Sequence, residues 1–159
     1  MNSGADSIHE ESAVLTVIKA VAGAMLGSVP SIILWVTLGK AGYVAAIGGF
    51  FMITGEIFAC SFMTKKSQQM NIEAATVICI IVMAASVYIC ERLIWSWELA
   101  DLLYAEGLTF PDCFLNFGRL TKELDINYDF RASLIRSGIF AAIGAIPGYI
   151  KACKELKFN

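Results

Sequence analysis

Hydrophobic residues in this chain are gathered into long runs that few charged residues interrupt. A helix needs about 20 residues to cross roughly 30 Å of hydrocarbon. Runs of that length predict four membrane-spanning helices, at residues 13–39, 43–63, 72–95 and 132–150. We therefore expect an all-α, polytopic membrane protein. Its parts are an acidic N-terminal segment (1–12), one transmembrane domain (13–155) and a short C-terminal tail (156–159).

The segment 96–130, between the third and fourth runs, has a different pattern. Apolar and acidic residues alternate at helical spacing up to Gly107, a residue type that often follows a helix. Thr109 and Pro111 then indicate a new helix with a hydroxyl cap and a proline in its first turn. We expect one or two amphipathic helices lying on the membrane surface, next to the interfacial residues Trp95 and Trp97.

Composition supports a membrane protein and excludes some partners. The chain is 57% hydrophobic and 16% charged, whereas soluble domains have about 45–50% apolar and about 25% charged residues. So small a chain could not hide this much apolar surface in a water-soluble core. The net charge of −2 and the lack of a basic block argue against nucleic-acid binding.

Lysine and arginine positions predict the orientation, because short cytoplasmic loops carry an excess of both. The second loop contains Lys65 and Lys66, and the C-terminal end adds further lysines. The cations expected on the opposite side, such as Arg119, are diluted by many acidic residues. The acidic N-terminus lacks the basic region of a signal peptide, so the first run should remain as a helix. We expect a bacterial inner-membrane protein with both termini cytoplasmic and segment 96–130 extracytoplasmic.

Four ionisable residues within the predicted spans are candidates for ion pairs or for a solute pathway, because charge in lipid is costly. Lys19 and Glu56 should lie at a similar depth near the cytoplasmic face, and Glu91 and Arg136 at a similar depth near the outer face. Each couple could form an ion pair. Alternatively, Lys19 and Arg136 extend to the interface and Glu91 reaches the headgroups. Glu56 has a short side chain, so we expect it to face protein or water.

Small residues line one face of each of the first two spans. Gly23 and Gly27 form a GxxxG pattern in the first span, and Gly42, Ala45 and Gly49 share a face of the second. Such faces let helix backbones approach closely in lipid. Tight packing within a monomer or dimer is favoured here over a transport pathway.

Two prolines lie inside predicted spans. Gly27 and Pro30 in the first span are echoed by Gly144 and Pro147 in the fourth. Proline disrupts helical hydrogen bonding, so both helices should be kinked. Kinked helices at matching positions also mark binding sites in some transporters.

Cysteine and histidine usage gives no sign of enzyme chemistry. Cys60, Cys79 and Cys90 fall within apolar runs, where a thiol behaves as a small hydrophobe, whereas Cys113 should meet water. There is no CxxC motif, and the single histidine is His9 near the N-terminus. We expect no disulfide framework, no catalytic or metal site and no cofactor.

The stretch from Gly23 to Phe50, GAMLGSVPSIILWVTLGKAGYVAAIGGF, resembles the first hairpin of an uncharacterised family of small four-span bacterial inner-membrane proteins. The resemblance implies four spans, a surface segment before the fourth and a glycine-rich second span. Where that family tends to have a Gly-Tyr pair, this chain has Gly55 and Glu56. No activity comes with the resemblance.

Two functions stay open at this point. The first is a transporter or channel for an ion or small solute, built as a homo-oligomer because four helices enclose little space. The second is a non-transporting scaffold or accessory subunit, which would dock on a membrane-protein partner through its small-residue faces and segment 96–130. An intramembrane enzyme is a distant third.

Overall fold

The computed structural model describes residues 3–40, 46–64 and 72–157, and within these ranges the chain is helical with no strand. The all-α prediction is confirmed. The four long helices are α1 (Ser3–Lys40), α2 (Ala46–Thr64), α3 (Ile72–Leu102) and α6 (Asn127–Lys157). Three short elements connect α3 to α6: the 3-10 helix η1 (Tyr104–Glu106), α4 (Phe110–Leu115) and α5 (Phe117–Glu123).

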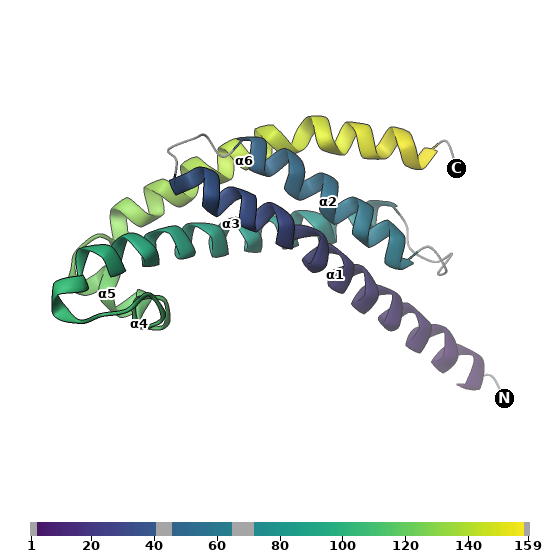
Figure 1. Ribbon diagram of the computed structural model, residues 1–159. Helices are drawn as coiled ribbons and strands as arrows, with labels where there is room; N and C mark the ends of the chain where they lie inside the picture. Colours follow the sequence, from purple (N-terminus) through teal and green to yellow (C-terminus); the bar gives the residue numbers. More distant parts are fainter. Residues whose placement is uncertain (1–2, 41–45, 65–71, 158–159) are drawn as a thin grey trace.

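The long helices lie side by side, and α2 is the central one (Figure 1). It packs against α1, α6 and α3, although it is the shortest of the four. Both chain termini lie at one end of the bundle, and α4 and α5 lie at the other end (Figure 1). The side chains of α2 are therefore enclosed by neighbouring helices on several sides.

Three helical stretches are long and apolar enough to cross a membrane by length and composition: Val14–Thr37, Ala74–Leu102 and Asn127–Ile150. The apolar stretch described in α2, Gly48–Met63, is shorter. The prediction of long apolar helices is thus confirmed for three of them. The expected packing residues Gly42 and Ala45 lie outside the described residues.

The long helices extend beyond several of the predicted spans: α1 begins at Ser3 rather than at residue 13, and α6 ends at Lys157 rather than at residue 150. Helix α3 continues past Trp95 to Leu102, and α6 begins at Asn127 rather than at residue 132. Neither glycine nor proline occurs between Trp95 and Leu102, so nothing in the sequence stops the helix at the aromatic residues. Only the middle of the segment 96–130 therefore lies outside the long helices.

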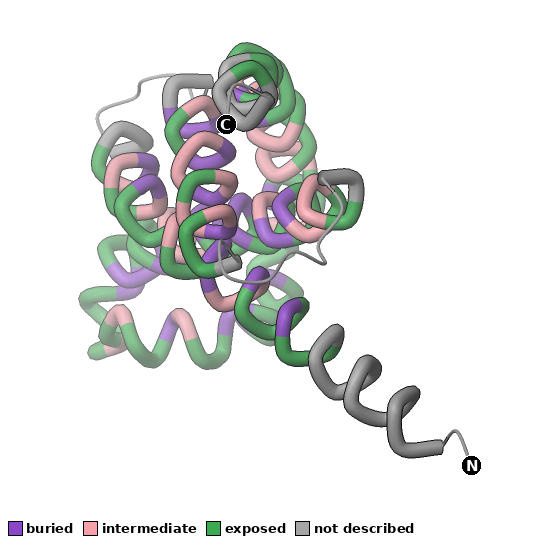
Figure 2. The backbone as a smooth tube through the Cα atoms, turned by 90° about the vertical axis from the view of Figure 1, so that its right-hand side faces the viewer, coloured by how far each residue is buried: buried purple, intermediate pink, exposed green. Residues whose placement is uncertain are grey.

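Many of the buried side chains of the bundle are small or polar, although large ones such as Trp35 and Met52 are buried too, and many large apolar side chains lie on its outside. In α1, for example, Ala20, Ala24 and Ser28 are buried, whereas Ile18 and Leu26 are exposed. Bands of buried and exposed residues alternate along the helices (Figure 2). The same division holds in α3 and α6, where most of the exposed large aliphatic residues are isoleucines: Ile80, Ile81, Ile89, Ile135, Ile139, Ile143, Ile146 and Ile150.

The connection between α3 and α6 follows its predicted turn chemistry. Gly107 ends η1 in the left-handed conformation, with φ of 76°, which glycine adopts without steric cost. Thr109 then caps α4, and its backbone N–H donates to Asp112 Oδ2 at 3.1 Å. Pro111 lies in the first turn of α4. The predicted helix start at Thr109 is confirmed.

Cys113 corrects an expectation, because its side chain does not meet water. It is fully buried in an apolar cluster between the end of α3, the short helices and the start of α6. The other buried members are Leu99, Ala100, Leu103, Phe117, Leu120 and Phe130. Burial, together with the charge of Asp112, raises the pKa of the Cys113 thiol. The sequence reasoning failed here because an amphipathic helix packs its apolar face, and Cys113 is on that face of α4.

Helices α1 and α6 run without a break through Pro30 and Pro147. A proline removes one backbone hydrogen bond from a helix without necessarily ending it. The kinks expected at Gly27, Pro30, Gly144 and Pro147 stay predictions.

Candidate functional site

Glycines of α1 lie directly against the backbone of α2. A Cβ atom placed on Gly23 would lie 2.8 Å from the carbonyl oxygen of Ala59, and one placed on Gly27 would overlap the carbonyl group of Gly55. The contact is reciprocal, because a Cβ on Gly55 would lie 2.6 Å from the carbonyl oxygen of Gly27. The GxxxG glycines therefore pack within this chain, against its own second helix.

On its other side, α2 makes an equally close contact with α6. A Cβ on Gly49 would lie 2.5 Å from the carbonyl oxygen of Ala141. Gly148 of α6 in turn faces α2, where a Cβ would lie 2.8 Å from the Ile53 side chain. Glycines thus bring both α1 and α6 close to α2, which leaves little room around the central helix.

Glu56 lies in this enclosed part of α2. Its side chain has 0% exposure, and neither carboxyl oxygen has a hydrogen-bond partner. Ile53 and Cys60 lie about one turn to either side on the same face, and both belong to a buried cluster at the centre of the bundle. The remaining buried members of that cluster are Ala20, Ala24, Cys79, Val82 and Ala145. The expectation that Glu56 faces protein agrees with this position.

The structure does not bring Lys19 to Glu56. Lys19 is exposed on the outside of α1, whereas Ala20, the next residue, belongs to the buried cluster. The two residues share an approximate depth, but successive positions on a helix point about 100° apart. Similar depth predicted a pair, but the Lys19 side chain is exposed whereas that of Glu56 is fully buried.

Glu91 finds partners, but Arg136 is not among those described. Glu91 is 4% exposed, and its carboxylate accepts hydrogen bonds from Ser133 Oγ at 2.7 Å and Ser137 Oγ at 2.6 Å. The two serines are one turn apart on α6, so both point at the same place on α3. Arg136 is exposed on a different side of α6. The two serine hydroxyls therefore take the place that the ion-pair hypothesis gave to Arg136 beside the Glu91 carboxylate.

Arg92 is a structural residue that the sequence analysis missed. Its Nη2 donates to the Phe114 carbonyl oxygen at 2.6 Å, and its guanidinium lies 4.5 Å from the centroid of the Phe114 ring. The Phe117 ring is also within 5.7 Å. Arg92 thereby fastens α4 and α5 to α3. Arg92 is a charged residue within an apolar run, next to Glu91. The sequence therefore marks it in the same way as Lys19, Glu56, Glu91 and Arg136.

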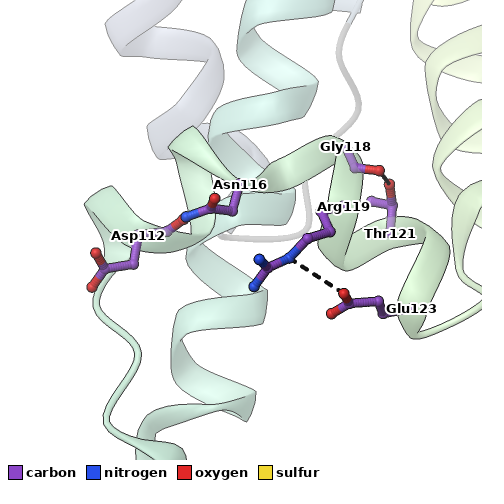
Figure 3. A network of polar contacts seen from close by, with 6 residues as sticks. All are labelled: Asp112, Asn116, Gly118, Arg119, Thr121 and Glu123. Carbon is purple, nitrogen blue, oxygen red and sulfur yellow. Dashed lines mark hydrogen bonds and ion pairs between the residues drawn. The ribbon is translucent and has the colours of Figure 1, made fainter.

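Figure 3 shows polar contacts within α4 and α5, most of which involve exposed side chains. Arg119 and Glu123 form an ion pair at 3.3 Å with side chains 69% and 58% exposed, and such exposed pairs add little stability. Asn116 Nδ2 donates to the Asp112 carbonyl oxygen at 2.9 Å. Hydrogen bonds from the Thr109 hydroxyl and then from its backbone N–H hold the pKa of Asp112 below its usual value. These contacts stabilise the short helices and form no enclosed site.

Within the described residues, no three His, Cys, Asp or Glu side chains are grouped so that they could hold a metal ion. The thiols of Cys60 and Cys79 share a hydrogen bond across α2 and α3. None of the four cysteines whose side chains are described, Cys60, Cys79, Cys90 and Cys113, forms a disulfide. The chemistry of the bundle interior therefore rests on two buried glutamates, which differ in that Glu91 has hydroxyl donors and Glu56 has none.

Comparison of the chain with protein-family models, with curated proteins and with solved structures gave no match. The resemblance of Gly23 to Phe50 to a family of small four-span bacterial proteins accordingly stays a prediction. The function is therefore inferred from the geometry of the helices and of Glu56.

Proposed function

We propose that this chain is an integral membrane protein with four membrane-spanning helices, which works as an oligomeric transporter or channel for an ion or small solute. The carrying observation is Glu56, a carboxyl group placed at the centre of the bundle without a hydrogen-bond partner. Polar groups buried without partners destabilise a fold. An apolar residue at position 56 would give a more stable fold. The presence of a buried glutamate there therefore favours a functional role.

The surface of the molecule supports the membrane location. Side chains such as Phe58, Leu26 and Ile135 are 74%, 66% and 65% exposed, whereas many of the buried residues of the bundle are alanine, serine or cysteine. In water this arrangement would leave a very large apolar surface unpaired. In lipid it is favourable, because hydrocarbon solvates the large side chains while small residues let the helices pack closely.

Helix α2 is the span whose length needs an argument. It has 19 residues, which at about 1.5 Å per residue extend about 28 Å and nearly match the hydrocarbon thickness. Glycine contacts hold it between α1 and α6, and the side chains on its exposed face, such as Phe58 and Phe62, are apolar and suit contact with lipid. The shared end of the two termini supports an even number of spans (Figure 1). The lysine pattern then favours cytoplasmic termini in a bacterial inner membrane.

A scaffold function is the second candidate, and the outer face of α6 is the observation that favours it. Ile135, Ile139 and Ile143 are exposed there, and a Cβ placed on the neighbouring Gly138 would meet nothing within 4 Å. This open face suits a second copy or another membrane protein. By contrast, Gly23, Gly27 and Gly49 are covered within the chain and are not free for a partner.

Flux through reconstituted liposomes tests the proposal. We expect purified protein to move an ion or solute, and Glu56→Gln to abolish that flux while the protein still folds. Glu98→Gln, at an exposed position of α3, is the matched control and should keep the flux. A scaffold would tolerate Glu56→Gln but lose its partner in Gly138→Leu. Protein that stays monodisperse in buffer without detergent would contradict the membrane location itself.

A further inference from the structure

The surroundings of Glu56 offer neither a counter-charge nor a set of oxygen ligands. The buried cluster around its face of α2 consists of aliphatic side chains and the thiols of Cys60 and Cys79. Buried hydroxyl groups occur elsewhere in the bundle, as at Ser28 and Ser86, but none is bonded to Glu56, and the Ser28 hydroxyl donates to the Met25 carbonyl oxygen at 2.8 Å. In the described part of the chain, Glu56 therefore faces groups that cannot solvate a negative charge well.

Among the side chains that the structure describes, the charged residues of α1, α3 and α6 are either exposed or bonded to other groups. Lys19 on α1 and Arg136 on α6 are exposed. On α3, Glu91 accepts from the two serines and Arg92 is bound to Phe114. The titratable groups that do face the Glu56 region are the two thiols, which are neutral and weak donors. A charged Glu56 would thus be buried without compensation.

These surroundings select the proton among possible cations. A hard metal ion such as Mg²⁺ or Ca²⁺ takes about six or more oxygen ligands, and the alanine, valine and isoleucine side chains here supply none. A proton needs only one carboxylate oxygen, and its binding removes the charge that burial penalises. The neutral acid is therefore the form of Glu56 that fits this conformation.

We propose that Glu56 is the proton-binding site of this protein, and that the ion it moves or couples to is H⁺. This inference rests on the proposed transport function. In the closed conformation Glu56 holds its proton as a neutral acid. When the helices open the site to water, the O–H bond breaks heterolytically, the proton passes to a water molecule as hydronium, and the carboxylate keeps the electron pair. Reprotonation from the other side lets the helices close again.

Infrared spectroscopy of the protein in lipid vesicles at pH 7 tests the site directly. Neutral carboxylic acids and carboxylates have separate C=O stretching bands, and solvent-exposed glutamates and aspartates are charged at pH 7. We expect a neutral-acid band in the wild-type protein that exchanges slowly in D₂O. Glu56→Gln should remove the band, and Glu91→Gln should retain it. Wild-type protein without a neutral-acid band would overturn the proposal, whether or not the variants fold.

A flux measurement separates this inference from the transport proposal. A pH-sensitive dye inside the same vesicles reports proton entry driven by a potassium diffusion potential. The band together with proton flux that Glu56→Gln abolishes supports both ideas. The band without any flux supports the proton site and contradicts transport. If the neutral-acid band is absent but sodium or a solute still crosses the membrane, the result supports transport and overturns the proton site.

Discussion

Gly27 of α1 and Gly55 of α2 lie so close that neither has room for a Cβ atom, and each would direct one at the carbonyl group of the other. Backbone atoms cannot move aside as a flexible side chain can. The contact fixes the distance between the first two helices at the level of Glu56, the residue that follows Gly55. The packing of α1 on α2 and the enclosure of the carboxyl group thus depend on the same pair of glycines.

We predict that Gly55→Ala destabilises the fold by about 1–3 kcal/mol, the usual range for adding atoms to a closely packed interior. The added methyl group would lie 2.6 Å from the Gly27 carbonyl oxygen, so α1 and α2 must separate. Reversible unfolding in mixed detergent micelles measures the change in the free energy of unfolding.

Gly138→Ala is the matched control for Gly55→Ala. A Cβ at Gly138 meets nothing within 4 Å, and alanine favours a helix over glycine by about 0.5–1 kcal/mol. This variant should therefore be as stable as the wild-type protein or slightly more stable. If both variants have the same free energy of unfolding, the close contact between α1 and α2 does not exist in lipid.

Removing both hydroxyl donors of Glu91 should destabilise the packing of α6 on α3. The double variant Ser133→Ala, Ser137→Ala leaves the buried carboxylate without its hydrogen bonds at 2.7 and 2.6 Å. Hydrogen bonds to charged groups contribute roughly 1.5–3 kcal/mol each, so we expect the loss of two to lower the free energy of unfolding by about 3–6 kcal/mol in the same measurement. Adding Glu91→Leu to the double variant should restore part of the lost free energy of unfolding, since the buried carboxylate without partners is then removed.

Arg136→Gln distinguishes this hydroxyl site from the ion pair that the sequence had indicated. Arg136 is exposed, so we expect its substitution to change the free energy of unfolding by less than about 0.5 kcal/mol. A loss as large as that of the double serine variant would instead show that Glu91 depends on the arginine.

Arg92→Lys should loosen α4 and α5 while leaving the long helices intact. Lysine keeps the positive charge but lacks the planar guanidinium that stacks on Phe114 and donates to its carbonyl oxygen. The two contacts together are worth about 1–3 kcal/mol. Amide hydrogen exchange in residues 110–123 should become about tenfold faster or more. Arg119→Lys, which alters only an exposed ion pair, should leave the exchange rates unchanged.

The helices and the turn before α4 could be predicted because each depends on residues that are close in sequence. Apolar run length predicted α1, α3 and α6, and the Thr109 and Pro111 pattern predicted the start of α4. The same local reasoning failed at Trp95, where interfacial aromatic residues were read as the end of a helix that continues to Leu102. Aromatic residues mark where a helix leaves the bilayer, and they do not stop it.

The partners of the buried charges could not be predicted, because depth along a helix does not give the direction of a side chain. Lys19 and Glu56 share a depth but not a direction, and Glu91 is served by Ser133 and Ser137, whose hydroxyls carry no charge to attract notice. For Glu56 the sequence indicated a position facing protein or water, and its side chain is buried in protein; Glu91 is buried as well, although the sequence left open whether it reaches the headgroups. Which neighbours they meet follows from the three-dimensional packing of glycine faces.

The cap of α4 should depend on pH through Asp112. Hydrogen bonds from the Thr109 hydroxyl and backbone N–H lower the pKa of this carboxyl in the folded protein. A lowered folded-state pKa means that the stabilisation is complete above the ordinary aspartate value of about 3.9 and is lost as the pH falls through the lowered value. The amide proton signal of Thr109, followed by NMR during acid titration, should therefore shift with a midpoint below that ordinary value.

Thr109→Val removes the hydroxyl but keeps the backbone donor, so its midpoint should move back towards the ordinary value, and Asp112→Asn should abolish the shift. A wild-type midpoint at or above the ordinary value would contradict the cap, because an unbonded carboxyl on a solvent-exposed helix titrates there.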